Sequence, residues 1–465
     1  MSKKKQFLKN VSMVVSSNLL ILVLGVAISF VLPVFLSVEQ YGYWQLYNYF
    51  IGFVGLFLFG FSDGMNLRYA GLPFHKLDRP LFIAFFRFIC YFTGVLTVLA
   101  LIFLNFFTKD TYLRIYLLIS VNILLFNVNG YFIHLSQMTM RFREYSIANA
   151  LERILFVLLF IPAFMFNITD FYYFIICNIL CRIVVIGYNV YRYKELFTGV
   201  KIFGKISDYS EIKENYIAGF PITMATIFSM LMTTMPRFVM GQIMPIAVYG
   251  MFSFGTTSIN LVIQIIAAMS SVFYPTLKTL SPQKVKETFP VASDLLTIFC
   301  ALSFLSYYAI FVIIELFFTK YTPVLEYLHL LFPTIMYQSI NSFLIANFSR
   351  VLRLERKYFW SNLFFVVINC ILTFTAAYSF GNVKIILLVS LLIMQLWVIH
   401  GNRFISSHFG MHSNVFWGAL CVSIFIISNE FLDIWLSFLV YFLVVSMIIY
   451  FKNRDGRLLR KIRRV

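Results

Sequence analysis

The sequence predicts an all-α integral membrane protein with about fourteen transmembrane helices, arranged as two parallel six-helix repeats plus two extra C-terminal helices. Three observations lead to this fold class: the composition, the long apolar runs and an internal repeat. Of the 465 residues, 61% are hydrophobic and only 12% are charged, and the mean hydropathy is +0.85. Soluble domains are about half apolar and a quarter charged, so this composition indicates a bilayer.

Long apolar runs follow one another along the whole chain. A helix needs about 20 apolar residues to cross the hydrocarbon core of a bilayer. The first run follows the basic start MSKKK and lacks a small-residue cleavage site, which predicts an uncleaved first span. The predicted spans lie at roughly 10–36, 41–62, 81–106, 111–135, 147–166, 168–191, 216–240, 244–272, 290–318, 323–348, 357–379, 383–402, 413–429 and 431–451.

The two halves of the chain resemble each other. The segment FVLPVFLSVEQYGYW from Phe30 returns as FVMGQIMPIAVYGMF from Phe238, and FTKDTYLRIYL returns later as FTKYTPVLEYL. In both copies of the first segment an apolar helix ends and a short loop follows. A Tyr-Gly elbow, Tyr41–Gly42 or Tyr249–Gly250, then opens the next helix. Each half holds six helices, an even number, so the repeat is predicted to be parallel, as in many alternating-access transporters.

The repeat and one long polar stretch divide the chain into four predicted parts. Residues 1–192 form an N-terminal six-helix lobe, and residues 216–405 form a C-terminal one. Residues 193–215 are rich in charged side chains and are predicted to be a cytoplasmic linker between the lobes. Residues 406–465 hold the two additional helices and a basic cytoplasmic tail.

The basic residues lie on one side of this topology. The chain has 37 Lys and Arg against 19 Asp and Glu, a net charge of +18, and most of the basic residues fall in loops on the side of Met1. This positive-inside pattern places both termini in the cytoplasm. The tail KNRDGRLLRKIRRV is then expected at anionic lipid headgroups, and no nucleic-acid partner is predicted.

No cofactor and no metal site is predicted. The six cysteines all lie within apolar runs without accompanying His or carboxylate ligands, so they are interpreted as small apolar residues. The chain has no GxxxxGK[ST] segment, which argues against an ATP-driven pump. Transport would then be coupled to a proton, to sodium or to the membrane potential.

With these features the chain resembles the polysaccharide (oligosaccharide) flippases, the O-antigen and exopolysaccharide transporters of the multidrug/oligosaccharidyl-lipid/polysaccharide (MOP) exporter superfamily. The resemblance lies in LPVFLSVEQYGYWQLYNYFIGFVGLFLFGFSDGMNLRYAG near the start and in MPRFVMGQIMPIAVYGMFSF of the second half. The family often has an acidic residue followed by Arg at the start of the second segment. Here Pro236 precedes Arg237, so the carboxylate of a local ion pair is missing.

The resemblance implies a MATE-like transporter, not an enzyme, in the bacterial inner (cytoplasmic) membrane. It would move an undecaprenyl-diphosphate-linked oligosaccharide, such as an O-antigen, capsule or exopolysaccharide repeat unit, from the inner to the outer leaflet. Its implied partners are that lipid-linked glycan, membrane lipids, and polysaccharide polymerase and chain-length proteins. In relatives the first, second, seventh and eighth helices line the cavity.

Polar side chains within the spans are predicted to line such a cavity, because a sugar chain needs amide and hydroxyl partners. The clearest pattern is a stripe on the eighth span, from Ser253 to Gln264, whose spacing of 4, 3 and 4 places its members on one helix face. Polar stripes also hold membrane helices together, and that alternative stays open here. The predicted lining residues are Asn18, Gln45, Asn48, Asn127, Thr226, Thr233, Ser253, Thr257, Asn260, Gln264 and Gln338.

Charged residues inside spans are functional candidates by default. Arg237, Arg182 and Arg87 are predicted to bind the diphosphate, because a planar guanidinium matches phosphate oxygens with two parallel donors. The alternatives are snorkelling of Arg237 and Arg87 to the headgroups and a structural hydrogen bond from Arg182. Asp294, close to the repeat position of Arg87, is the candidate for a gate or for proton coupling.

Other functions stay open. A multidrug or cation-coupled exporter of the same superfamily is the closest alternative, but three Arg against one Asp within the spans favour an anionic substrate. A lipid-linked peptidoglycan-precursor flippase shares the fourteen-helix count. A membrane glycan polymerase has less support, because the outer loops are short and the first of them carries a single acidic residue, Glu39.

Overall fold

The computed structural model is all-helical, which confirms the all-α part of the predicted fold class, and the residues that it describes form no strand. It describes residues 23–25, 27–107, 111–199, 204, 208–278, 280–411 and 416–453. The start of the first predicted span, with the predicted lining residue Asn18, lies outside the described residues. The rest of that span contains a short apolar helix, Val23–Phe35.

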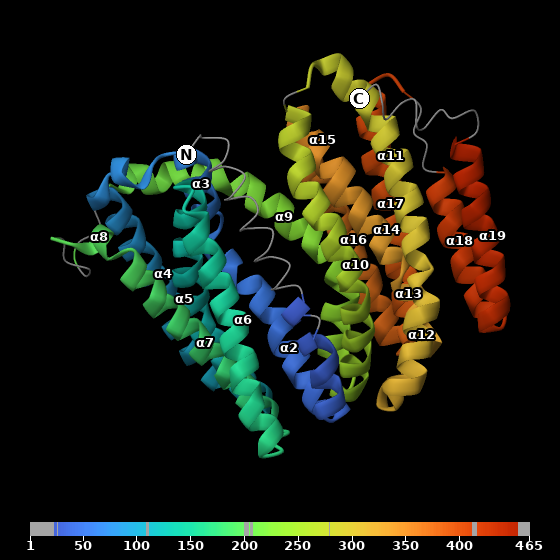
Figure 1. Ribbon diagram of the computed structural model, residues 1–465, viewed down its shortest axis with the longest axis horizontal. Helices are drawn as coiled ribbons and strands as arrows, with labels where there is room; N and C mark the ends of the chain where they lie inside the picture. Colours follow the sequence, from blue (N-terminus) through green and yellow to red (C-terminus); the bar gives the residue numbers. More distant parts are fainter. Residues whose placement is uncertain are drawn as a thin grey trace. The chain divides into compact units, whose positions relative to one another are not determined.

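The chain divides into two compact units, Met1–Met224 and Ala225–Val465 (Figure 1). The division falls inside the long helix α9 (Tyr209–Ile243), so α9 takes up the end of the predicted linker. The four-part domain layout stays a prediction.

Before α9, the first unit contains α2 (Val38–Val54), η1 (Gly55–Leu58), α3 (Phe61–Tyr69), η2 (Phe74–Lys76), α4 (Arg79–Phe107), α5 (Thr111–Met138), α6 (Phe142–Met165), α7 (Phe171–Arg192) and α8 (Lys194–Phe197).

The second predicted span is broken in the structure. The run of α2 and η1 ends at Leu58, α3 begins at Phe61, and the two parts are bent by 61°. Phe59 and Gly60 form the break with left-handed backbone, at φ of 46° and 90°. Glycine adopts this conformation readily whereas an L side chain is strained in it, so Gly60 is the residue that permits the bend.

Helices α3 and α9 pack backbone against backbone. A Cβ atom on Gly64 would lie 1.8 Å from the carbonyl oxygen of Asn215, and one on Gly219 would lie 1.9 Å from that of Gly60. These distances leave no room for a side chain. Gly60 and Gly64 have the G-x-x-x-G spacing that lets membrane helices approach closely. This close approach fixes the position of the first turns of α9 against α3.

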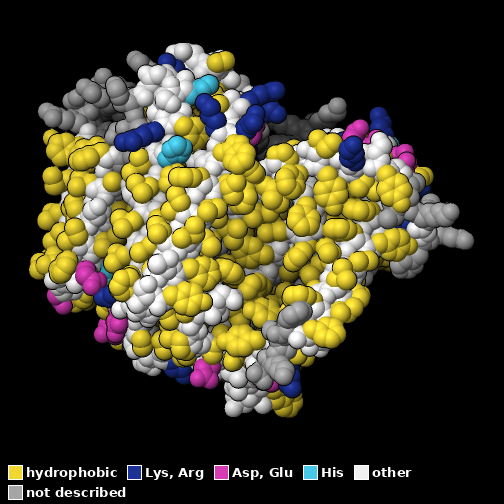
Figure 2. Space-filling model, turned by 180° about the vertical axis from the view of Figure 1, so that it is seen from behind, with side chains coloured by type: hydrophobic (Ala, Val, Ile, Leu, Met, Phe, Trp, Pro, Cys, Tyr) yellow, Lys and Arg dark blue, Asp and Glu magenta, His cyan; other side chains and the backbone are white. Residues whose placement is uncertain are grey.

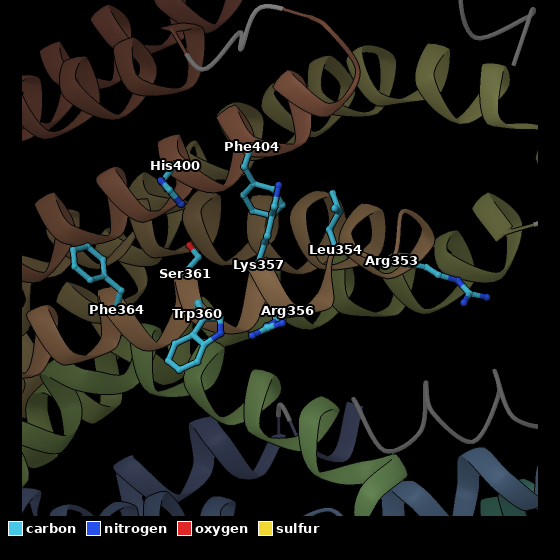
Figure 3. A pocket seen from close by; sticks show the side chains of 9 residues that line it. All are labelled: Arg353, Leu354, Arg356, Lys357, Trp360, Ser361, Phe364, His400 and Phe404. Carbon is cyan, nitrogen blue, oxygen red and sulfur yellow. The ribbon is translucent and has the colours of Figure 1, made fainter.

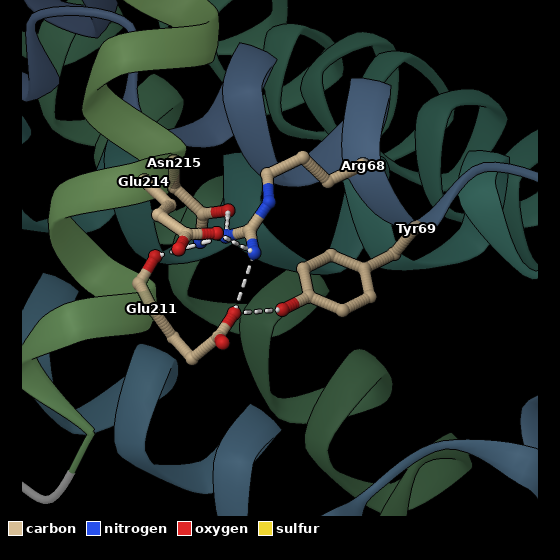
Figure 4. A network of polar contacts seen from close by, with 5 residues as sticks. All are labelled: Arg68, Tyr69, Glu211, Glu214 and Asn215. Carbon is tan, nitrogen blue, oxygen red and sulfur yellow. Dashed lines mark hydrogen bonds and ion pairs between the residues drawn. The ribbon is translucent and has the colours of Figure 1, made fainter.

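A polar cluster fastens the end of α3 to the first turns of α9 (Figure 4). Arg68 donates to the carboxylates of Glu211 at 2.6 Å and Glu214 at 2.5 Å, and to the side-chain oxygen of Asn215 at 2.8 Å. The hydroxyl of Tyr69 donates to the same Glu211 oxygen at 2.8 Å. We call these five residues the α3–α9 clasp. It joins segments that are over 140 positions apart in the sequence.

Aromatic side chains fill the core of the first unit around α3, α4, α5 and α8. Phe61, Phe85 and Tyr131 are completely buried there, and the ring centroids of the two phenylalanines are 5.5 Å apart. The Tyr131 hydroxyl donates to the carbonyl oxygen of Phe82 at 2.9 Å, which satisfies its polar atom in the apolar interior.

The tenth predicted span, 323–348, is not a regular helix. In the second unit the run from Thr319 to Val351 passes through a 3₁₀ helix, two short α-helices, a π-helical segment and another α-helix. Pro323 and Pro333 each remove a backbone donor, and the π segment widens the helix by an extra residue.

After α9 the second unit contains α10 (Ile246–Lys278), α11 (Pro282–Phe304), α12 (Ser306–Phe317), η3 (Thr319–Val324), α13 (Leu325–Leu331), α14 (Pro333–Ser339), η4 (Ile340–Ile345, the π segment), α15 (Ala346–Val351), α16 (Glu355–Phe380), α17 (Val383–His408), α18 (Phe416–Phe431) and α19 (Ile434–Asn453).

The chain is a multi-pass membrane protein. Within the described residues, ten helices are long and apolar enough to cross a bilayer, or eleven if the bent α2–α3 pair is one span. Figure 2 shows apolar side chains over the helix flanks, with Lys and Arg toward the helix ends. The predicted total of fourteen is not reached by this measure, because the 319–351 run is broken, α18 has 16 residues and the first span is only partly described.

The two ends of the second unit differ in charge. One end is where α10 and α15 finish and α11 and α16 begin, and the other is where α12 and α18 finish. The first end carries the basic residues Lys278, Lys284, Lys286, Arg350, Arg353, Arg356 and Lys357 together with Glu287 and Glu355. The second end carries Glu315, Glu326, Glu430 and Asp433 together with Lys320 and Lys384. This difference agrees with the positive-inside pattern expected from the sequence.

One turn occurs in both units. After α5 the backbone N–H of Arg141 donates to the carbonyl of Ser136 at 2.8 Å, and after α15 that of Leu354 donates to the carbonyl of Ser349 at 2.7 Å. The residue before each donor has the same left-handed φ of 55°. The donors are 213 positions apart. The same turn also ends α6, where Ile168 donates to Ala163, and α17, where Met411 donates to Ser406, so the layout of the repeat stays a prediction.

Candidate functional site

A cavity of about 360 Å³ lies among the helices of the second unit. Residues of α9, α10, α17 and the broken run from α13 to η4 form its walls. This volume is within the range of about 300–1,000 Å³ that is common for small-molecule sites. Its polar lining side chains are Thr226, Ser229, Thr233, Thr234, Arg237, Thr256, Asn260, Thr334, Gln338, Asn341 and Ser342.

Helical spacing brings these side chains to one place. On α9 the lining positions recur every three or four residues from Thr226 to Arg237, and on α10 they do so from Phe252 to Ile263. This is the period of one helix face. Two polar faces on neighbouring helices therefore meet the broken run at the cavity. The broken run adds Gln338 from α14 and Asn341 from the π segment.

Among the described residues that line this cavity, Arg237 alone is charged. Its Nε atom donates to the hydroxyl of Tyr249 at 3.2 Å, and its guanidinium lies 5.8 Å from the centre of the Tyr249 ring. Tyr249 is completely buried and belongs to the second Tyr-Gly elbow. The elbow therefore orients the arginine, a role that its position in the sequence repeat did not predict.

Two amide side chains in the cavity make no hydrogen bond to the residues that the structure describes. Asn260 and Gln338 line it, and neither side chain makes a hydrogen bond within the described part of the chain. Asn341, by contrast, donates to Ser229 at 2.6 Å and to Tyr358 at 3.1 Å. The amides of Asn260 and Gln338 thus keep donors and acceptors available for a bound molecule.

The cavity gathers only part of the predicted site. The predicted residues that line it are Thr226, Thr233, Arg237, Asn260 and Gln338. Three members of the polar stripe predicted on the eighth span, which is α10, do not line the cavity. Ser253 is completely buried, Thr257 donates to the Ser253 carbonyl at 2.8 Å, and Gln264 is exposed. Sequence reasoning missed the hydroxyl residues beside the predicted ones, although the three- or four-residue spacing of Ser229 and Thr234 on α9 was a usable signal. The others are Thr256, Thr334 and Ser342.

Arg182 lies in the first unit and is paired. Its guanidinium contacts the carboxylate of Glu152 at 3.2 Å and the amide oxygen of Asn122, and it lies 5.1 Å from the Phe126 ring centre. The sequence count of three Arg against one Asp within spans was wrong, because α6 also contains Glu152 and Arg153. The structural hydrogen bond that the sequence left open for Arg182 is present.

The other predicted lining residues of the first unit contact neighbouring backbone or side chains. The Asn127 amide donates to the carbonyl of Val54 at 3.1 Å, which links α5 to α2. Gln45 is buried and donates to the hydroxyl of Tyr41. Asn48 donates to the carbonyl of its own helix one turn earlier, at 2.9 Å. The Asn127 contact is one of helix packing, whereas the Gln45 and Asn48 contacts lie within α2 itself.

Arg87 and Asp294 are half-buried and belong to different units, so the gate formed by this pair stays a prediction. The guanidinium of Arg87 covers Gly204, where an added Cβ atom would lie 3.1 Å from the Arg87 Cζ atom. Asp294 lies on α11 and does not line the cavity that contains Arg237. The described residues hold no group of three or more His, Cys, Asp or Glu side chains suited to a metal ion.

Comparisons with known proteins identify the fold. No family model matches the chain, and no curated protein matches it. Among solved structures it is similar to the lipid II flippase MurJ in an inward closed conformation, with a TM-score of 0.66 and 13% identity over 96% of this chain and 99% of that one. An outward-facing MATE-family multidrug transporter of the MOP superfamily matches with a TM-score of 0.49 and 11% identity, over 90% and 96%. The chain therefore has the fold of a lipid II flippase.

Proposed function

We propose that this protein is an alternating-access flippase that moves an undecaprenyl-diphosphate-linked oligosaccharide from the inner to the outer leaflet of a bacterial cytoplasmic membrane. The observation that carries the proposal is the cavity of the second unit. It combines one oriented cation, Arg237, with the unpartnered amides of Asn260 and Gln338. The similarity of fold to a flippase supports a transporter in place of an enzyme.

The chemistry of the cavity fits an anionic glycolipid headgroup. A guanidinium binds phosphate oxygens through two parallel N–H donors, and these charge-assisted bonds are about twice as strong as neutral ones. Amides and hydroxyls supply the donors and acceptors that a sugar requires. An arginine held among apolar helices is costly to retain without a function. The lining has no carboxylate, which disfavours the cationic drugs of the alternative multidrug exporter.

Lipid II transport is the second candidate. It is favoured by the TM-score of 0.66 with a lipid II flippase, and it would use the same diphosphate contact at Arg237. The two candidates differ in the glycan, which the amides of Asn260 and Gln338 would contact. Comparing transport of lipid II with that of an undecaprenyl-diphosphate oligosaccharide lacking peptide decides between them.

The experiment is a flipping assay in proteoliposomes. Fluorescent undecaprenyl-diphosphate oligosaccharide is incorporated, and its arrival in the opposite leaflet is measured by quenching. We expect Arg237→Gln to lower the rate by roughly 10- to 100-fold, because a charge-assisted pair contributes about 1.5–3 kcal/mol. Arg237→Lys should retain an intermediate rate, because it keeps the charge and loses the two-pronged geometry.

The matched control is Arg143→Gln, because Arg143 is exposed and lies at the start of α6 in the first unit. It should leave the rate unchanged. Equal rates for wild type and Arg237→Gln would overturn the assignment of Arg237, and transport of cationic drugs alone would overturn the proposed substrate class.

The energy source is part of the same proposal. Moving a negative charge outward from a negative cytoplasm is favoured by about 2.3 kcal/mol per charge per 100 mV, so the membrane potential can drive export of a diphosphate. Arg87 and Asp294 are proposed to act at the inner gate. If Asp294 couples transport to protons, Asp294→Asn will abolish the dependence of the rate on an imposed pH gradient and leave its dependence on an imposed potential.

A further inference from the structure

A second opening in the second unit lies along the seam between α16 and α17 (Figure 3). This groove encloses about 710 Å³. Its walls are the turn before α16, the first turns of α16 and the last turns of α17. In Figure 3 Lys357 extends from α16 toward Phe404 of α17. The groove shares no lining residue with the Arg237 cavity, so it is a separate site.

One end of the groove is strongly basic. Arg353, Arg356 and Lys357 line it and are exposed. Their side chains make no ion pair and no hydrogen bond within the described part of the chain. The groove lining contains no carboxylate, and the adjacent Glu355 does not belong to it. Three positive charges without neutralising partners therefore lie around one opening.

The other end of the groove is apolar and faces outward. Trp360 and Phe364 are 57% and 59% exposed, and the exposed side chains of Val367 and Ile371 continue the same ridge along α16. At a rise of about 1.5 Å per residue, Phe364 lies roughly 12 Å along the helix from Arg356. A cationic head region followed by an apolar ridge has the polarity of a phospholipid, and an exposed tryptophan between them is typical of the membrane interface.

We infer that this groove binds an anionic phospholipid, with its phosphate at Arg353, Arg356 and Lys357 and an acyl chain along Trp360 and Phe364. The groove lies at the basic end of the second unit, where the loops are predicted to face the cytoplasm. Basic pockets between membrane helices on that side suit anionic headgroups. The apolar ridge selects a lipid over free phosphate, because a free ion would leave the ridge unused. The lipid is a resident ligand and is not the transported molecule.

The test measures lipid binding to the purified full-length protein by native mass spectrometry, with phosphatidylglycerol compared with phosphatidylcholine. The variant combines Arg353→Gly, Arg356→Gln and Lys357→Gln. Glycine is chosen at position 353 because its φ of 55° favours glycine, so this change removes the charge without backbone strain. We expect the affinity for phosphatidylglycerol to fall by roughly 100-fold, since each basic side chain near an anionic surface contributes about fivefold.

The matched control removes three exposed charges outside the groove, in the variant Arg143→Gln, Lys213→Gln and Lys284→Gln. It should change the affinity less than about twofold. Trp360→Ala tests the apolar end, and it should weaken phosphatidylglycerol binding and leave binding of inorganic phosphate unchanged. Thermal unfolding of each variant confirms that it is folded.

Four results would overturn the inference. They are equal affinity for phosphatidylcholine, an equal loss in the control variant, binding of inorganic phosphate as tight as that of phosphatidylglycerol, and preferential displacement by undecaprenyl diphosphate. The last result would assign the groove to the transported lipid. Loss of phosphatidylglycerol binding confined to the groove variants supports the inference that the groove binds an anionic phospholipid.

Discussion

At the residue scale, two intramembrane arginines with the same sequence signal have different surroundings. Arg182 is 6% exposed at its side chain and pairs with Glu152 and Asn122 on neighbouring helices. Arg237 is half-buried, lines a cavity and is oriented by the phenol of Tyr249. The carboxylate of Glu152 offsets the charge of Arg182, and this contact comes from the tertiary structure.

The Arg182–Glu152 pair yields a prediction about stability. Arg182→Gln leaves the Glu152 carboxylate without its cation in a low-dielectric setting, and we expect a loss of about 3 kcal/mol. The double variant Arg182→Gln with Glu152→Gln should recover most of this loss, because it removes both charges. Thermal unfolding in detergent measures both. A double variant no more stable than the single one would contradict the pairing.

The same pair shows what the sequence could reveal of the site. Spacing on α9 and the charge of Arg237 were visible in the chain and predicted part of the cavity. The partner of Arg182 lies 30 positions away on another helix, and its contact depends on how α6 packs against α7. The position of Gln338 depends on the broken run before the π segment. Periodicity describes one helix at a time and does not predict such contacts.

At the element scale, the close packing of α3 against α9 depends on glycine residues, which have no side chain. We expect Gly64→Ala to destabilise the first unit by at least about 3 kcal/mol, because its Cβ atom would lie 1.8 Å from the Asn215 carbonyl oxygen. The matched control is Gly130→Ala in α5, where a Cβ atom would meet nothing within 4 Å. That change should stabilise the protein by about 0.5–1 kcal/mol. Chemical unfolding of the two variants checks the contrast, and equal effects would contradict the close crossing.

The α3–α9 clasp predicts local order at the start of α9. Arg68→Gln removes the cation shared by Glu211 and Glu214, which leaves two carboxylates close together. We expect hydrogen exchange of the backbone amides in the first two turns of α9 to become faster by roughly tenfold, while α5 is unchanged. Hydrogen exchange with mass spectrometry measures this. Unchanged exchange at α9 would show that the clasp does not order it.

The predicted helices agree with the structure where an apolar run is uninterrupted, as for α4, α5 and α7. The predicted helices differ from the structure where the backbone leaves the regular helical conformation. The break at Phe59 and Gly60 lies within the second predicted span, although the G-x-x-x-G spacing of Gly60 and Gly64 was a signal for close packing. Hydropathy records the length of an apolar run and does not show whether the helix inside it bends.

At the scale of the whole molecule, the predicted parallel repeat has a direct consequence. Six helices per half place equivalent positions of the two halves on the same side of the membrane. Arg143 and Glu355 are such positions, exposed at the starts of α6 and α16 just after the shared turn. Thr169 and Ser379 are exposed near the opposite ends of helices in each half. A parallel repeat keeps each pair together, and an inverted repeat would separate both pairs.

Single cysteines at these four positions test the arrangement. The six native cysteines are first replaced, and a membrane-impermeant maleimide is then applied to intact cells. We expect Thr169→Cys and Ser379→Cys to react from outside, and Arg143→Cys and Glu355→Cys to react only after the membrane is opened, because basic loops stay in the cytoplasm. Reaction of Arg143→Cys and Glu355→Cys on opposite sides would contradict the parallel repeat. If Glu355→Cys is the one that reacts from outside, the groove at Arg353 would also lie at the outer leaflet, where the charge asymmetry that favours an anionic lipid is weaker.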